Sequence, residues 1–172
     1  INFLSAARLF LFGARDVWFV VALPVYLSSV LDWDFWQVGG FLALWVIGYG
    51  LVQSIAPAIT GRSKAALPDG RAACIWAVLL AGLPAVIALG LGSTLSAQWV
   101  LVGGLLLFGA VFAVNSSLHS YLIVSYAKAD GVSLDVGFYY MSNALGRLLG
   151  TVLSGWVYQV YGLQACLWIS SA

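Results

Sequence analysis

Three ionisable side chains, Arg15, Asp16 and Arg147, lie in the middle of stretches that are otherwise almost entirely apolar. A charged side chain at the centre of a bilayer costs about 2.5–3.5 kcal/mol on insertion scales, so such residues usually contact a transported ion or substrate. The chain has no glutamate. The fork of a guanidinium group matches the oxygen pair of a phosphate or arsenate group. We therefore expect Arg15 and Arg147 to bind an anionic small molecule.

Arg147 is the leading candidate to clamp an oxyanion, and its alternative role is a buried ion pair with Asp16 that joins two helices. Both roles can coexist, because such a pair can open when the substrate arrives. Arg15 and Asp16 are adjacent, so their side chains point about 100° apart on a helix. Arg15 shares a face with Arg8 and Tyr26. We therefore assign Arg15 to a cavity and Asp16 to a helix partner or a proton site, with a pair of packing ions as the alternative.

Further polar and aromatic side chains recur at helical spacing, which places them on slowly winding faces of their helices. One such face carries Asp135, Tyr139, Asn143, Arg147 and Thr151. A second carries Gln37, Phe41, Trp45, Tyr49 and Gln53, and a third carries Asn115 and His119. We expect substrate hydrogen bonds from Tyr49, Gln53, Asn115, Tyr139 and Asn143. Hydrogen bonding between helices explains each of these residues equally well.

His119 is the only histidine, and imidazole titrates near neutrality, so proton coupling is a candidate role for it and for Asp16. The alternative for His119 is a hydrogen bond between helices. Gly146 and Gly150 form a small-residue pair beside Arg147, which predicts the close approach of a neighbouring helix. Asp135 is read as a residue at a helix start, where the helix dipole favours a carboxylate.

The composition excludes several classes of protein. Hydrophobic residues make up 63% of the chain and charged residues 8%, with a mean hydropathy of +1.02, whereas soluble domains carry about 25% charged residues. A net charge of +1 without a basic stretch argues against a nucleic acid partner. The chain offers no catalytic constellation and no metal or cofactor motif. We expect a membrane protein in contact with the lipid bilayer that is not an enzyme.

The two cysteines, Cys74 and Cys166, fall in apolar segments that are expected to end near opposite faces of the membrane. A disulfide requires Cα atoms within about 7 Å, and a shared soft-metal site requires similar proximity. We therefore expect both residues to be small buried apolar side chains.

The apolar stretches predict an all-α bundle, because a membrane-spanning helix needs about 20 apolar residues and barrel strands are shorter and alternate in polarity. The predicted spans are 5–31, 36–59, 72–93, 98–125 and 133–159, with a truncated sixth at 163–172. The third span has no charged, amide or hydroxyl side chain between Trp76 and Leu91. We expect it to face lipid, and the first, second, fourth and fifth spans to face a wet cavity.

Lys and Arg predict the orientation of the bundle. Arg62, Lys64 and Arg71 follow the second span and Lys128 follows the fourth, whereas the opposite connectors have neither residue type. The first of those opposite connectors carries Asp32 and Asp34. The connectors near 60–71 and 127–132 are therefore expected to be cytoplasmic.

This pattern resembles one half of a major facilitator transporter. In that superfamily each six-helix half consists of two inverted three-helix repeats, whose first two helices line the central cavity. The connector at 61–71 resembles a degenerate copy of the family's short basic loop, and the chain has no start methionine. We expect the C-terminal half, with the N-terminal half of the same transporter supplying the other wall of the cavity.

A closer resemblance rests on three stretches: ARDVWF (14–19), FWQVGGFLALWVIGYG (35–50) and DGVSLDVGFYYM (130–141) with Asn143, Gly146, Arg147, Gly150 and Thr151. They resemble the organoarsenical efflux permeases of bacterial arsenic-resistance operons. The resemblance implies export of 1-arseno-3-phosphoglycerate across the bacterial inner membrane. It also implies a functional link to glyceraldehyde-3-phosphate dehydrogenase, which makes that compound from arsenate, and proton antiport as the driving force.

The sequence leaves two alternatives open and argues against a third. A facilitator that exports another organic anion, such as a sugar phosphate or a drug, would use the same arginines. A membrane subunit or enzyme that does not transport anything is a different class. An arsenite channel or pump would need neighbouring thiolates, and the placement of the cysteines argues against it.

Overall fold

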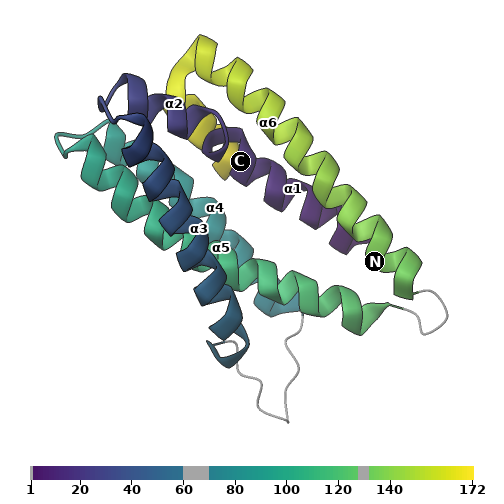
Figure 1. Cartoon of the computed structure of the whole chain (residues 1–172). Helices are drawn as coiled ribbons and strands as arrows, with labels where there is room; N and C mark the ends of the chain where they lie inside the picture. Colours follow the sequence, from purple (N-terminus) through teal and green to yellow (C-terminus); the bar gives the residue numbers. More distant parts are fainter. Residues whose placement is uncertain (1, 60–69, 128–131) are drawn as a thin grey trace.

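The computed structural model describes residues 2–59, 70–127 and 132–172, and within these ranges the chain is all-helical (Figure 1). The helices are α1 (Asn2–Phe19), α2 (Ala22–Ser29), α3 (Phe35–Ile59), α4 (Gly70–Leu91), α5 (Ala97–Tyr126) and α6 (Val132–Ser171). The all-α prediction is therefore confirmed. The division of this bundle into inverted repeats stays a prediction.

Among the described residues, four segments are long and apolar enough to cross a membrane, which is compatible with a multi-pass membrane protein. They are Asn2–Ser29, Phe35–Ala56, Arg71–Leu91 and Ala97–Tyr126, with mean hydropathies of 1.6, 1.6, 2.4 and 2.1. The fifth predicted span is helical as part of α6 but is not among them. Its polar residues, including Asp135, Asn143 and Arg147, lower its hydropathy. Membrane crossing by α6 stays a prediction.

The first predicted span is interrupted, contrary to expectation, at Val20 and Val21, which separate α1 from α2. Pro24 explains the break, because a proline has no N–H to donate and its ring clashes with the carbonyl group four residues earlier. The backbone N–H of Ala22 instead donates a hydrogen bond to Oγ of Ser154 at 3.0 Å. A side chain of α6 therefore satisfies a backbone donor at the break.

The expected boundary between the fifth and sixth spans lies at Gly162, inside α6. Gly162 has φ 79° and ψ −177°, and this left-handed region suits a residue without a Cβ atom. The segment 163–171 turns back toward α1 and α4 (Figure 1). Its Gln164 donates a hydrogen bond from Nε2 to the carbonyl oxygen of Ala88 on α4 at 3.2 Å.

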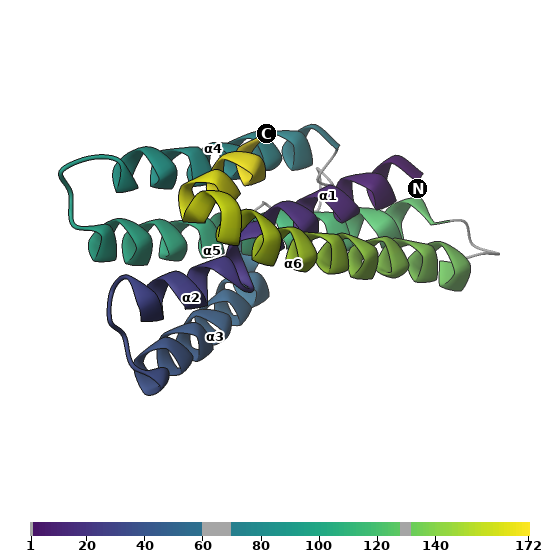
Figure 2. The same ribbon diagram turned by 90° about the horizontal axis from the view of Figure 1, so that it is seen from above.

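α1 and α6 lie side by side in both views (Figures 1 and 2), and glycines allow their close approach. A Cβ atom at Gly146 would clash with the backbone of Leu9, and one at Gly150 would lie 2.6 Å from the carbonyl oxygen of Gly13. Small residues at a helix interface let the two backbones come together. The predicted role of Gly146 and Gly150 in close helix packing is confirmed.

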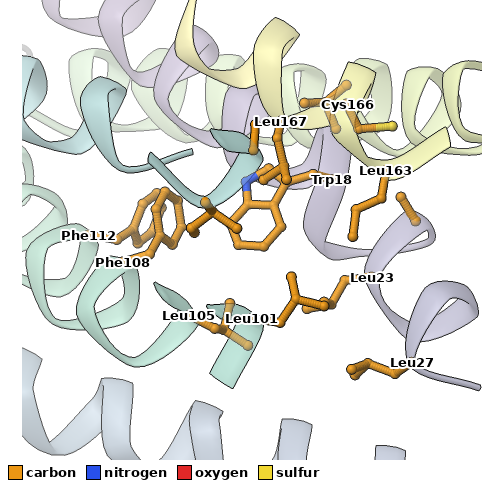
Figure 3. Packing of buried hydrophobic residues seen from close by; sticks show 14 of the residues in the cluster. Trp18, Leu23, Leu27, Leu101, Leu105, Phe108, Phe112, Leu163, Cys166 and Leu167 are labelled. Carbon is orange, nitrogen blue, oxygen red and sulfur yellow. The ribbon is translucent and has the colours of Figure 1, made fainter. Parts of the chain in front are cut away.

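The main hydrophobic core joins α1 and α2 to α5 and to the end of α6 (Figure 3). Trp18 is fully buried, and its ring packs edge-on against Phe108 with 5.1 Å between centroids. Cys166 is buried in this core as expected. Cys74 is exposed, so the prediction of a buried side chain is wrong there. It shares the outward face of α4 with Val78, one turn further on.

The aromatic stripe of α3 was expected to face water, and this is wrong for Trp45. Trp45 is buried against α5 and donates a hydrogen bond from Nε1 to the carbonyl oxygen of Leu105 at 2.8 Å. Gly109 of α5 leaves room for its ring, because a Cβ atom there would lie 2.7 Å from Trp45 Nε1. The outer face of α3 carries exposed Leu44, Ile47, Leu51 and Ile55. On α4, the outer face is also apolar, and its contact with lipid stays a prediction.

Candidate functional site

Asp16 forms ion pairs with both arginines that the sequence placed at mid-depth. Its Oδ1 atom accepts a hydrogen bond from Nε of Arg15 at 2.6 Å, and its Oδ2 atom accepts one from Nε of Arg147 at 3.2 Å. The side chain of Asp16 is 1% exposed, that of Arg15 11% and that of Arg147 56%. One carboxylate thus serves two guanidinium groups, which leaves one positive charge uncompensated within the cluster.

The close contact between α1 and α6 places Asp16 against α6. A Cβ atom added at Gly150 would lie 3.0 Å from the Cβ atom of Asp16, and Arg147 stands nearly one turn before Gly150. The carboxylate therefore reaches α6 only because that helix presents glycine at this level. The Asp16–Arg147 ion pair expected as one alternative is present, and a role in substrate binding stays a prediction for both residues.

The side chains of Arg15 and Asp16 form an ion pair, so the expectation that they point to different partners is wrong. Adjacent Cα–Cβ bonds do point apart on a helix, but the long arginine side chain folds back to the neighbouring carboxylate. The guanidinium carbon of Arg15 lies 4.6 Å from the ring centroid of Phe12 and 5.0 Å from that of Phe112. Such cation–π contacts offset part of the desolvation of the buried head group.

Arg15, Asn115 and His119 do come together around a cavity of about 280 Å³. α1 contributes Arg15, α5 contributes Asn115 and His119, and the remaining walls are mainly alanine, leucine and phenylalanine side chains of α1, α4 and α5. Asn115 is 0% exposed and His119 5%. Neither amide atom of Asn115 has a hydrogen-bond partner, and Nδ1 of His119 also has none, within the described ranges. Proton coupling through His119 stays a prediction.

Arg8 is a residue that the sequence reasoning left out of the candidate site. It is 5% exposed, and its Nη1 atom donates hydrogen bonds to Oγ of Ser116 at 3.0 Å and to the carbonyl oxygen of Ser116 at 3.4 Å. Its guanidinium carbon lies 4.2 Å from the ring centroid of Phe12 and 5.0 Å from that of Tyr139. The sequence could have indicated this role, because Arg8 lies on the same helix face as Arg15, two turns before it.

The polar stripe of α6 is divided between buried and exposed positions. Tyr139 is 0% exposed, with its ring against Arg8. Asn143 is half-buried, and its Oδ1 atom has no hydrogen-bond partner in the part of the chain that the structure describes. Asn143 lies one turn from both Tyr139 and Arg147. A substrate contact by either Tyr139 or Asn143 stays a prediction.

The two candidates on α3 are half-buried. Tyr49 stacks on Trp45 with 5.7 Å between ring centroids and lies 5.9 Å from the ring of Phe112. Phe112 also contacts Arg15, so Tyr49 belongs to the aromatic surroundings of the arginines. No hydrogen bond between described residues joins Gln53 to the arginines or to Asp16.

The arrangement brings together three guanidinium groups, with amide and hydroxyl groups beside them. Those of Arg8 and Arg15 are largely covered by apolar helices, and the side chain of Arg147 is 56% exposed. Among the described residues, no group of three His, Cys, Asp or Glu side chains is placed to hold a metal ion. Chemically, the site can recognise anions and exchange ion-pair partners. Comparisons of the chain with models of known families, with curated proteins and with solved structures found no match.

Proposed function

We propose that the chain forms the C-terminal six-helix half of a major facilitator transporter in the bacterial inner membrane. In this proposal the protein exports an anionic organoarsenical compound, 1-arseno-3-phosphoglycerate, by alternating access. The N-terminal half of the transporter supplies the facing wall of the cavity, and proton antiport drives the export.

The observation that carries the proposal is the position of Arg147. It lies close to the midpoint between Val132 and Gly162, and its side chain is 56% exposed although Nε is bound to Asp16. A guanidinium group at this depth is costly against hydrocarbon, so it is expected to face water, another protein surface or an anion. A central cavity between two halves of a transporter provides all three.

The helix contacts support the inverted-repeat interpretation. If α1 to α4 form the first repeat and α5 and α6 the second, the pseudo-two-fold axis of inverted repeats gives each contact between them a reciprocal counterpart. A contact between the first helix of one repeat and the second helix of the other is then expected in both directions. α1 packs along α6, and α5 packs along α3. Two inverted repeats require this reciprocal relationship, which makes it support for the proposed fold.

The proposed cargo rests on the resemblance of residues 14–19, 35–50 and 130–151 to the organoarsenical permeases. This compound carries one phosphate and one arsenate group, and clustered guanidinium groups suit such oxyanions. Everted membrane vesicles containing the protein test the proposal directly. Vesicles supplied with glyceraldehyde 3-phosphate, NAD, arsenate and the dehydrogenase are expected to accumulate arsenic.

The controls separate the proposed cargo from its alternatives. Omitting the dehydrogenase is expected to abolish arsenic uptake, because arsenate itself is then the only arsenic compound present. Uptake of a sugar phosphate without uptake of arsenic would favour a facilitator for another organic anion. Absence of transport for every anion would favour a membrane subunit without transport activity.

A further inference from the structure

The charges of Arg8, Arg15 and Arg147 are compensated unequally. Both ion pairs between described residues are made by Asp16, with Arg15 and Arg147. Arg8 takes part in neither pair. The groups that interact with it electrostatically include Tyr139, Tyr49, Arg15 and His119, and none of these is a carboxylate. Arg8 is therefore a buried cation without a carboxylate partner in the described ranges.

The contacts of Arg8 satisfy its guanidinium group only in part. Nη1 is bound to Ser116, but the buried Nε atom has no hydrogen-bond partner among the described residues. A buried charge without an ionic partner is unfavourable, and contacts with aromatic rings offset only part of the desolvation. The site thus has unused capacity for a negatively charged acceptor.

The direct contacts of Arg8 come from α1, α5 and α6, three of the four helices that the sequence assigned to a wet cavity. α5 contributes Ser116 and also His119, which interacts electrostatically with Arg8. α6 contributes the ring of Tyr139, whereas Tyr140 of α6 and Tyr49 of α3 act on Arg8 through electrostatics alone. Tyrosine and serine hydroxyl groups can donate to the remaining oxygens of an anion. Several helices together therefore supply the groups around Arg8.

We propose that Arg8 binds a tetrahedral oxyanion group of the cargo, on the N-terminal side of the Arg15–Asp16–Arg147 cluster along α1. The inference rests on the proposed transport function and adds a residue to its site. Arg8 and Arg15 are separated by about 10 Å of helix rise, and both contact the ring of Phe12. An anion at Arg8 is therefore held next to the deeper cluster, on the side predicted to be cytoplasmic.

Binding requires that the guanidinium group be uncovered. The ring of Tyr139 on α6 and the ring of Phe12 on α1 both contact it in this structure. A movement of the Tyr139 side chain away from Arg8 uncovers one face of the guanidinium group and leaves the close contact of α1 and α6 at Gly146 and Gly150 in place. The buried state described here then corresponds to a closed arrangement of the Arg8 site.

The test is the thermal stability of the purified protein in lipid nanodiscs, titrated with inorganic phosphate at constant ionic strength. A ligand that binds the folded state raises the unfolding midpoint as its concentration increases. We expect a saturable rise for the wild type and none for Arg8→Gln. We expect binding at least about tenfold weaker for Arg8→Lys, because lysine keeps the charge but loses the fork. The matched control is Arg71→Gln, which removes an exposed arginine and is expected to keep the wild-type response.

The phosphate titration still tests the proposal if the Arg8→Gln variant does not fold. The phosphate affinity of Arg8→Lys is then the deciding measurement. If this variant binds phosphate as tightly as the wild type does, the proposal is wrong. Absence of any phosphate response in the wild type would overturn it as well. Failure of arsenic transport together with an Arg8-dependent phosphate response would instead refute the proposed cargo and leave the anion site standing.

Discussion

The Oδ2 atom of Asp16 accepts a hydrogen bond from Nε of Arg147 at 3.2 Å, and this contact joins α1 to α6 across more than a hundred positions of sequence. The same carboxylate binds Arg15 through its other oxygen. An anionic cargo could therefore replace Asp16 as the partner of one arginine while the other arginine keeps the carboxylate occupied. This arrangement allows an ion pair to open without leaving a buried acid alone.

Removal of the Asp16 carboxylate is expected to destabilise the protein. Asp16→Asn leaves both arginines without their acidic partner, and breaking a buried ion pair typically costs about 3–5 kcal/mol. We expect the lower end of this range, because the Arg147 side chain is 56% exposed. Thermal unfolding in detergent measures the effect. Asp32→Asn is the control, since Asp32 is exposed and asparagine tolerates its positive φ of 55°. Equal midpoints for the two variants would show that Asp16 does not stabilise the bundle.

The glycine contacts of α6 predict different effects for two chemically identical substitutions. Gly150→Ala places a methyl group 2.6 Å from the carbonyl oxygen of Gly13, so α1 and α6 must separate. We expect a loss of about 1–3 kcal/mol. Gly155→Ala meets nothing within 4 Å and is expected to be neutral or stabilising, because alanine favours a helix. Chemical denaturation of both variants checks the prediction, and a stable Gly150→Ala would contradict the close packing of these helices.

The break between α1 and α2 depends on one hydrogen bond from another helix. Ser154→Ala removes the acceptor of the buried Ala22 N–H and is expected to cost about 1–3 kcal/mol. Ser125→Ala is the matched control, because that hydroxyl group is exposed and binds only within its own helix. A fall in the unfolding midpoint for Ser125→Ala alone would contradict the role given to Ser154.

Asn115 offers a test that separates stability from function. Both of its amide atoms are buried without a partner in the described structure, and replacing such a group by an apolar one of similar size can stabilise a protein. Asn115→Leu is therefore expected to raise the unfolding midpoint. If Asn115 contacts the substrate, the same variant loses transport. If the variant is more stable and transports at the full rate, Asn115 does not contact the substrate. If the variant is less stable, the amide group of Asn115 has hydrogen-bond partners in the membrane.

The sequence predicted the helices well where a single physical signal dominated. Long apolar runs identified the helical spans, and Gly162 marked the turn that ends the long part of α6. The break after Phe19 was missed because the apolar pattern continues through it, although Pro24 was a local signal. In α3, the spacing from Gln37 to Gln53 identified a common face. Hydrophobic periodicity alone does not distinguish a face that packs on another helix from one that faces water, and Trp45 packs on α5.

The candidate site was predicted less completely, because it depends on how helices distant in sequence meet. The Asp16–Arg147 pair was anticipated from the scarcity of charges in the apolar stretches. The burial of Arg8 follows from the approach of Ser116 on α5 and Tyr139 on α6, and neither approach is written in the local sequence around Arg8. The contact of Arg8 and Arg15 with the same ring of Phe12 likewise requires side-chain positions.

Arsenic efflux from cells that produce either the wild type or Arg147→Lys tests the central claim, that guanidinium groups inside the bundle bind an anionic cargo. Both proteins must be present in the membrane at equal amounts, and the cells must contain the dehydrogenase and receive arsenate. We predict rapid export of pentavalent arsenic by the wild type and a loss of about tenfold or more in the variant, because lysine cannot form the bidentate contact. Wild-type cells that retain as much arsenic as cells without the protein, or a variant that exports at the wild-type rate, would contradict the account.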